Sequence, residues 1–441
     1  MSNQNILDHG AKGDGETDDA AAIQATIDKC AAAGGGRVVV PAGRTFVAGP
    51  FELRSKVEFH LEHGSCVVAN PERGLYTDQV FPGWDDGTKW IHATGAEDIA
   101  VTGSGVIDGR GRAFVADRQP HRHWPASGRP FMFNFEDCRR ITMEAVTLRD
   151  SAFWAVHLLG CDDALFNGIR ILNNPLMPNC DGIDPHRSRN VRIIGCYIEA
   201  GDDCICPKSE AGFEHYGATE DIIASGCTLV SSSCAIKIGS GTYGEFRRMV
   251  FDSCIIRNSH RGLGIQLRDG GVVEDVLFSN MFIETRFCEQ FWWGDATPVY
   301  VTAFEREPGA PLGVVRDIRF SNIACRSENG VYIAANKTDA IRDITFDNVS
   351  VKLDRWTTYP GGNYDRRPSV MEPERSETPT SGFHLDTASD ITIRDCSVTW
   401  GENLPEYYRH ALCAMNVTGL TTERLKGDAA FPDRYEAVVT E

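Results

Sequence analysis

Seven segments of this chain share one pattern of strand-forming residues. Each has alternating β-branched or aromatic residues, a small turn-forming pair and a second short strand: NVRIIGCYI, DIIASGCTL, RMVFDSCII, DVLFSNMFI, DIRFSNIAC, DITFDNVSV and DITIRDCSV. Four of the six spacings between them are 26 to 31 residues, and the other two are longer. A unit of this length buries its apolar face only when it is stacked on its neighbours. The repeat therefore predicts an all-β solenoid, a right-handed parallel β-helix.

The second half of each segment carries a cysteine or an asparagine at a recurring place: Cys196, Cys227, Cys254, Asn280, Asn322, Asn348 and Cys396. Stacked asparagines are expected to hydrogen-bond from coil to coil, and a cysteine there acts as a small buried hydrophobe. The chain has 15 cysteines but no CxxC pair and no close Cys/His cluster. We therefore expect reduced, buried thiols, no metal site and no cofactor.

Residues 1–441 are predicted to form one β-helix domain with three additions. Residues 18–33 predict a capping helix, because Asp18 or Asp19 is a suitable N-cap, Ile23 and Ile27 have helical spacing, and glycines follow. Residues 281–315 and 352–382 lengthen two repeats and are predicted to be inserted loops. The second loop is rich in proline and charge, and we expect it over a cleft or at a subunit contact of a homo-oligomer.

The formal net charge of −18 argues against a nucleic-acid partner and against binding to an anionic membrane surface. The first residues lack the basic and apolar regions of a signal peptide, and no run of about 18 apolar residues occurs. These features predict a cytoplasmic protein with no membrane partner.

Two acidic clusters lie close together in NCDGIDPHRSRNVRIIGCYIEAGDDC, residues 179–204. Asp181 and Asp202 are 21 residues apart, close to one coil, and one coil displaces the chain by about 4.8 Å. The clusters are therefore expected on the same face, where neighbouring carboxylates hold different protonation states. A general acid beside a general base is the arrangement that glycoside hydrolysis uses. The alternative is that both are Asp-rich turns that bond their own backbone.

Five segments in order, GAKGDGETDDAAAIQATIDKCAAAGGGRVVVPAG, GSGVIDGRG, FWAVHLLGC, NCDGID and GDDCICPKS, resemble the motifs of glycoside hydrolase family 28, the polygalacturonase group. The resemblance covers most of residues 5–350. It implies a right-handed parallel β-helix that hydrolyses α-galacturonosyl links of pectin with inversion. By the same resemblance Asp202 is the general acid, and Asp181 and Asp203 hold the attacking water.

The chain departs from this family at two motifs that lie beside the acids. Cys234 stands where the family's G-H-G motif has histidine, and Gly264 and Gln266 replace the Arg and Lys of R-I-K. Lys237 and Arg268 are basic residues two or three positions away. We therefore expect a modified uronate-binding site, with weak activity on long polygalacturonan and exo-activity on short intracellular oligosaccharides.

Other residues are candidates for the walls of a sugar site. His157 is interpreted either as a cleft wall or as a core histidine, and Lys208 either as a sugar ligand or as part of a solvated face. The tandem Trp292 and Trp293 either stack on sugar rings or pack inward. The substrate-binding candidates are thus His157, Lys208, Lys237, Gln266, Arg268, Trp292 and Trp293.

Two other functions remain open on the same fold. A polysaccharide lyase needs a base to remove the C5 proton, often with Ca²⁺ held by acids, and Lys237 or Arg268 is the candidate base. A non-catalytic carbohydrate-binding β-helix predicts binding without turnover. Absorbance of an unsaturated uronate and sensitivity to chelators distinguish the lyase from the hydrolase.

Overall fold

The computed structural model describes residues 2–441, which divide into a unit ending at Asp202 and a unit Asp203–Glu441. Each unit is a right-handed parallel β-helix. A typical coil runs through three short strands, as in β13 (Pro130–Glu136), β14 (Arg139–Glu144) and β15 (Thr147–Arg149). The fold class is therefore confirmed, whereas the single domain over 1–441 stays a prediction.

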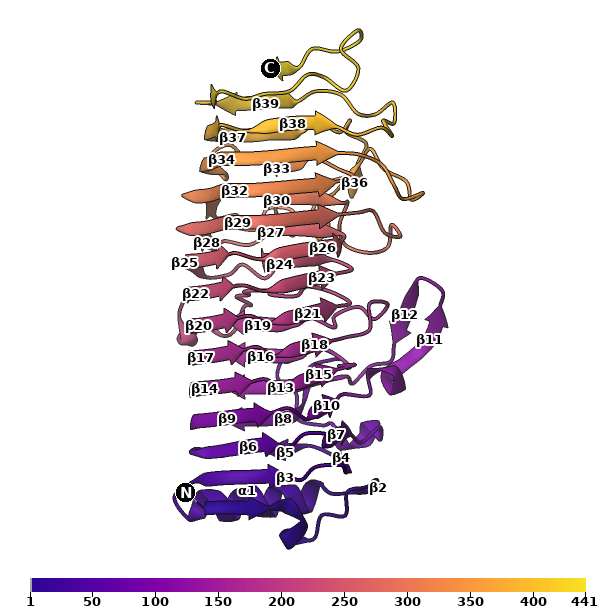
Figure 1. Cartoon of the computed structure of the whole chain (residues 1–441). Coiled ribbons are helices and arrows are strands. Elements are labelled where there is room, and N and C mark those ends of the chain that lie inside the picture. The colour runs from indigo at the N-terminus through magenta and orange to yellow at the C-terminus, as the bar shows by residue number, and fades with distance from the viewer. Residues whose placement is uncertain (1) are drawn as a thin grey trace. The chain divides into compact units, whose positions relative to one another are not determined.

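In the first unit, parallel strands stack in columns (Figure 1). One column comprises β5 (Phe51–Glu52), β8 (Thr88–Thr94), β13, β16 (Val156–Leu159) and β19 (Ile183–His186). A second comprises β3 (Gly36–Val40), β6 (Val57–Leu61), β9 (Glu97–Gly103), β14, β17 (Asp162–Asn167) and β20 (Arg189–Ile194). A third includes β4 (Thr45–Ala48), β7 (Cys66–Ala69), β10 (Val106–Asp108), β15, β18 (Arg170–Leu172) and β21 (Tyr197–Ala200).

Alternate residues of these strands form the core. Met143 of β14 pairs with Phe166 of β17, which pairs with Ile193 of β20, and all three side chains are fully buried. Each coil therefore covers the apolar residues of the next one, which is how a short repeat acquires a core.

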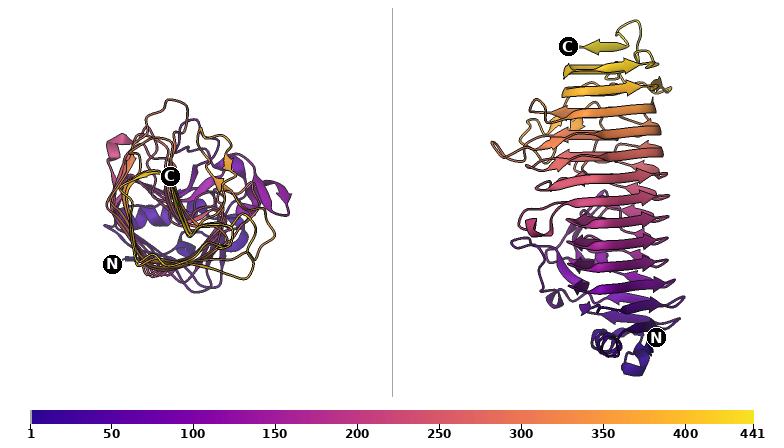
Figure 2. Two further views of the ribbon diagram at one scale, coloured as in Figure 1. Left: turned by 90° about the horizontal axis from the view of Figure 1, so that it is seen from above. Right: turned by 90° about the vertical axis from the view of Figure 1, so that its left-hand side faces the viewer.

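The helix α1 (Ala20–Ala32) is located at the N-terminal end of the first unit (Figure 2). It buries Ile23, Ile27 and Cys30, so the predicted capping helix is present, with slightly shorter bounds. The carboxylate of Asp18 accepts the Ala20 N–H at 2.9 Å. Asp19 instead accepts two N–H groups of the preceding loop, and it makes no side-chain cap of the helix.

One hairpin of the first unit has no counterpart in the sequence prediction. The antiparallel strands β11 (Val115–Gln119) and β12 (Arg122–Pro125) project from the coils (Figure 1). Trp124 on β12 is exposed, and the Arg122 guanidinium stacks on its ring at 4.0 Å.

The second unit continues the same coil pattern, with long strands along one side. One column comprises β22 (Thr219–Ser225), β25 (Glu245–Asp252), β29 (Val276–Thr285), β32 (Ile318–Ser327), β34 (Arg342–Leu353) and β37 (Phe383–Arg394). Another comprises β24 (Cys234–Gly239), β27 (Arg261–Leu267), β30 (Thr297–Ala303), β33 (Val331–Ala335) and β37. Phe251, Phe278, Phe320 and Phe346 stack inside at 4.9 to 5.1 Å between ring centroids.

The expected asparagine ladder is present, but the cysteines stand beside it. Asn322 donates to Asn280 at 3.2 Å, and Asn348 donates to Asn322 at 2.9 Å. Because Ile255 pairs with Phe282, Cys254 is level with Met281. The asparagines are left-handed turn residues with exposed side chains, whereas the cysteine one position later points into the core. Cys and Asn are therefore neighbours in the turn, and the prediction of one shared position was wrong.

The two predicted insertions differ in kind. Residues 281–315 contain the end of β29, the complete strand β30 and the short strand β31 (Val314–Val315), so only 286–296 and 304–313 are loops. Residues 352–382 form a long excursion between β34 and β37, with a small antiparallel pair β35 (Tyr364–Asp365) and β36 (Arg375–Ser376). The ring of Tyr364 stacks on that of Tyr332 in β33 at 4.0 Å.

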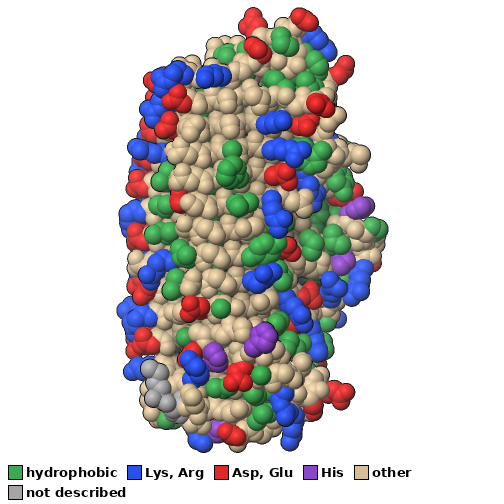
Figure 3. Space-filling view, viewed as in Figure 1, with side chains coloured by type: hydrophobic (Ala, Val, Ile, Leu, Met, Phe, Trp, Pro, Cys, Tyr) green, Lys and Arg blue, Asp and Glu red, His purple; other side chains and the backbone are tan. Residues whose placement is uncertain are grey.

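All 15 cysteines are free thiols, and 12 of them are buried. On the surface, Lys and Arg side chains alternate with Asp and Glu along an edge of the face in Figure 3. Arg140 pairs with Asp98, and Arg248 pairs with Asp221, so ion pairs between oppositely charged side chains join successive coils. Among residues 2–441, no helix has the length and apolar character needed to span a membrane.

Candidate active site

Asp181 lies in the loop that enters β19, and its side chain is 2% exposed. The backbone holds it in place: its carbonyl accepts the Ala155 N–H at 3.0 Å and the Asn173 amide at 3.1 Å. The same Asn173 amide also donates to the Cys180 carbonyl, and its oxygen accepts the Ser151 N–H. Asn173 therefore fixes the direction in which the Asp181 carboxylate leaves the main chain.

Asp202 is half-buried and ends the first unit. Its Oδ2 accepts the N–H of Asn179, two residues before Asp181, at 3.0 Å. Gly201 precedes it in a tight space, because a Cβ there would lie 2.1 Å from the Met177 carbonyl oxygen and 2.4 Å from that of Asn174. The two acidic segments 179–181 and 201–202 are thus joined by a direct contact within this unit.

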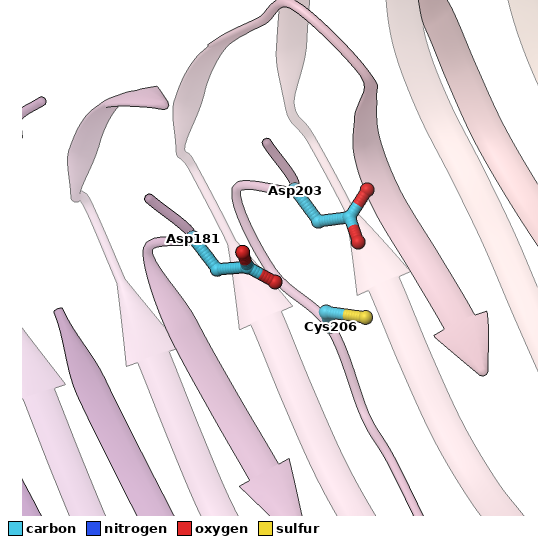
Figure 4. Close-up of side chains that lie close together, drawn as sticks. All are labelled: Asp181, Asp203 and Cys206. Atoms are coloured by element: carbon cyan, nitrogen blue, oxygen red, sulfur yellow. The ribbon is translucent and has the colours of Figure 1, made fainter. Parts of the chain in front are cut away.

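Asp203 is the first residue of the second unit and is 1% exposed. Ser233 donates to its Oδ1 at 3.2 Å, and its Oδ2 forms an ion pair with the ammonium of Lys237. Figure 4 shows Asp203 and Cys206, which both belong to the second unit. A carboxylate oxygen of Asp203 and the sulfur of Cys206 lie within 4.8 Å of each other. Asp181, also labelled in Figure 4, belongs to the first unit. Burial alone would raise the pKa of Asp203, but Lys237 and Lys208 outweigh it and lower that pKa below its usual value. Asp203 is therefore held as a carboxylate.

The family of the chain follows from its sequence. Residues 30–359 match the model of glycosyl hydrolases family 28. The chain belongs to this family. A probable polygalacturonase of Vitis vinifera is 29% identical over 301 residues, 64% of this chain and 60% of that protein. A probable polygalacturonase of Arabidopsis thaliana is 31% identical over 284 residues, 62% of this chain and 56% of that protein. The match thus spans less than two thirds of these relatives.

Solved structures agree with the family at the level of the fold. A hyperthermoactive exopolygalacturonase from Thermotoga maritima superposes with a TM-score of 0.69 at 23% identity, over 80% of this chain and 87% of that one. A polygalacturonase from Erwinia carotovora has a TM-score of 0.63 at 22% identity, over 76% and 90% of the two chains. Both comparisons support the β-helix described above.

This family 28 chain uses Lys237 in a way that the sequence did not indicate. Lys237 was predicted to contact substrate, but its ammonium is paired with the buried Asp203. Lys208 is also buried, at 6% exposure, and its charge acts on the same carboxylate. Two lysines facing Asp203 favour an ionised carboxylate over a bound cation, so the Asp203 and Cys206 pair is a poor metal site.

Two of the predicted substrate residues hold the 352–382 loop instead. Gln266 donates to the Arg367 carbonyl at 3.3 Å, and Arg268 donates to the Pro368 carbonyl at 2.5 Å. Arg268 also donates to the hydroxyl of Thr302 at 3.0 Å and has no exposed surface. The structure therefore gives Gln266 and Arg268 a structural role, because the loop consumes their donors and shields them from solvent.

The histidine and the two tryptophans that were predicted as substrate contacts differ in how far they are buried. His157 is fully buried between Asn134, at 2.9 Å, and His186, at 3.2 Å, so it takes the core alternative. Trp292 is 5% exposed and its carbonyl accepts two arginine side chains of the loop. Trp293 is 37% exposed, so it is the more accessible member of the pair, and its stacking on a sugar ring stays a prediction.

Sequence reasoning missed the residues that orient the acids. Arg129 is 2% exposed and donates to the Pro178 carbonyl at 2.7 Å and to the Asn179 side chain at 3.1 Å. Its charge is balanced by Asp86 at 2.7 Å. Arg129 reaches the Pro178 carbonyl from 49 residues away, so no local motif marks it. Asn173 reaches the carbonyls of Cys180 and Asp181 from within the same loop.

Proposed function

We propose that this chain hydrolyses glycosidic bonds of pectin-type oligosaccharides with Asp202 as general acid and with Asp181 and Asp203 activating water. The observation that supports the proposal most is the buried Asp203 carboxylate, which its ion pair with Lys237 keeps in the ionised form that a base needs. Family membership supports the reaction type.

The hydrogen bond that Asp202 accepts bears on which of its two carboxyl oxygens carries the proton for transfer. Oδ2 accepts the Asn179 N–H, so a proton for transfer must be carried by Oδ1. Asp202 then gives that proton to the leaving glycosidic oxygen while a water, losing its own proton to a carboxylate, attacks the anomeric carbon. One C–O bond breaks and one forms, with inversion and without a covalent intermediate.

The lyase alternative receives less support. Arg268 remains protonated at any working pH and is covered by the loop, so it is unsuitable as a base. Lys237 is paired with a buried carboxylate, which favours its charged form. Neither residue is then ready to remove a C5 proton from a sugar ring.

We further propose exo-action on short substrates. The support is the 352–382 loop, which lies on the outer face of three consecutive strands through Gln266 of β27, Tyr300 of β30 and Tyr332 of β33. A covered outer face restricts the length of glycan that lies along the coils. The lack of side-chain cations at positions 264 and 266 supports a weaker grip on a polyuronate, because charge-assisted contacts to carboxylates are the strong ones.

An intracellular location is also proposed. It is supported by the 15 free cysteines, of which 12 are buried among apolar residues. Proteins that function in oxidising compartments more often pair such thiols.

The Asp202→Asn variant tests the proposed general acid. The amide keeps the shape and an oxygen for the Asn179 N–H but has no proton to give, so turnover of an oligogalacturonide should fall about 10²- to 10⁴-fold. Asp137→Asn, at an exposed turn position, is the matched control and should keep full activity. An Asp202→Asn protein that is folded, as judged by circular dichroism, and retains more than about a tenth of the turnover contradicts the assignment.

A further inference from the structure

Cys234 and Gly264, two of the departures from the family's motifs, lie next to Lys237 in the adjacent strands β24 and β27. Lys237 pairs in register with Gly264. A Cβ at Gly264 would lie 2.9 Å from the Cys234 sulfur, 3.6 Å from Cγ of Lys237 and 3.6 Å from Cδ of Arg261. Three other side chains therefore fill the space that an arginine at position 264 would need.

The two cations in that space have separate partners. The Arg261 guanidinium stacks on the Tyr300 ring at 3.7 Å and lies 3.6 Å from the Asp295 carboxylate, and both of those side chains are fully buried. The Lys237 ammonium instead pairs with Asp203, with side-chain exposures of 9% and 1%. Arg261 is thus paired with Asp295, whereas Lys237 is paired with Asp203.

We propose that Lys237 is a positioning residue for Asp203, and that Gly264 and Cys234 are the small residues that make room for it. The proposal rests on the proposed function, since it assumes that Asp203 serves as a base. It assigns Lys237, Gly264 and Cys234 one joint role: the lysine of β24 balances the charge of Asp203, and the two small residues leave space for it. A carboxylate with almost no exposure needs such a partner, because an unpaired buried charge is costly.

Other charged or titratable groups also face Asp203. Within the second unit these are Lys208, Cys206 and Cys234. Lys208 remains when Lys237 is removed, so the carboxylate would retain one lysine but lose its direct ion-pair partner.

The test compares Lys237→Met, Lys237→Arg and the control Lys352→Met, whose lysine is exposed on β34. Lys237→Met should lower kcat about 100-fold or more on an oligogalacturonide that wild type hydrolyses, with a smaller change in KM. Loss of the positive charge makes Asp203 easier to protonate, so the acid limb of the kcat/KM profile should move to higher pH. Lys237→Arg should recover at least tenfold, and Lys352→Met should match wild type.

A folded Lys237→Met protein with wild-type kcat and pH profile overturns the proposal, and so does one in which only KM rises, because that is the behaviour of a substrate contact. If Lys237→Met does not fold, Lys237→Gln is subject to the same criteria. A wild-type chain that hydrolyses no pectin-type oligosaccharide refutes the proposed function instead.

The role of Gly264 has an independent test. Gly264→Ala should lower kcat with the same shift of the acid limb, because its methyl group presses on the Cys234 sulfur and so disturbs the packing beside Lys237. Adding Cys234→Ala removes the 2.9 Å contact and should restore activity. Failure of Cys234→Ala to improve the Gly264→Ala protein contradicts the shared-space argument.

Discussion

Gly201 shows how backbone space, at the scale of one residue, positions the candidate acids. The place of its missing Cβ is closed by two carbonyl oxygens, which belong to the loop that also carries Asn179. That loop donates the N–H that Asp202 accepts. A side chain at position 201 would therefore push apart the two acidic segments.

Gly201→Ala should destabilise the protein by about 1–3 kcal/mol, since the contacts of 2.1 and 2.4 Å are to backbone that cannot rotate away. Activity should fall with it, because the contact between Asn179 and Asp202 is strained. Urea unfolding measures the first effect and steady-state kinetics the second. Gly74→Ala, where nothing lies within 4 Å, is the control. Equal urea midpoints for Gly201→Ala and Gly74→Ala would show that the loop shifts to accommodate the methyl group, and would contradict this prediction.

The sequence singles out the candidate acids, whose roles stay a prediction, but it does not indicate the contacts of the basic residues. Asp181, Asp202 and Asp203 stand out because two clusters recur at about one coil. Lys237, Gln266 and Arg268 were interpreted as substrate ligands because they stand at or near the positions of the family's G-H-G and R-I-K motifs. Lys237 meets a buried carboxylate, and a loop from about 100 residues away covers the other two.

At the scale of an element, the 352–382 loop is held by stacked rings. The Tyr332 ring lies 4.0 Å from that of Tyr364 in the loop and 5.5 Å from that of His384 in β37, and the Tyr364 and His384 rings are 5.7 Å apart. His384 is 6% exposed, and burial lowers its pKa to about 4. The length and composition of the loop were predictable, but its docking depends on contacts distant in sequence.

The depressed pKa of His384 predicts a pH dependence of stability. Above pH 6.5 this histidine is neutral in both the folded and the unfolded chain. Between about 6.5 and 4 the unfolded chain binds a proton that the folded protein refuses, so the free energy of unfolding should fall as the pH falls, by roughly 3 kcal/mol at most from this group. His260 acts in the same direction, because burial lowers its pKa as well.

His384→Phe keeps a ring and removes the titrating group, so its unfolding free energy should decline less between pH 6.5 and 4 than that of wild type. His410→Phe, at a half-exposed position, is the control. Chemical denaturation at several pH values provides the comparison. Parallel pH slopes for His384→Phe and wild type would show that His384 does not carry the effect.

At the scale of the whole molecule, periodicity was the informative signal. Repeats from residue 190 onward predicted coils, and the earlier coils follow the same alternation although their sequences are less regular. The turn register was misjudged by one residue, because asparagine outside and cysteine inside are adjacent at the same corner. The β11–β12 hairpin was missed because it leaves the coil pattern altogether.

The most direct test of the account is product analysis by NMR and chromatography, with wild-type protein acting on α-linked galacturonate trimer and, separately, on polygalacturonan. The trimer should lose one sugar at a time, and the first new reducing ends should be β-anomers. No unsaturated uronate should form, and the polymer should be the poorer substrate. Initial α-anomers or an unsaturated product would contradict the inverting hydrolysis assigned to Asp181, Asp202 and Asp203. Rapid production of mixed fragments from the polymer would contradict the exo-action.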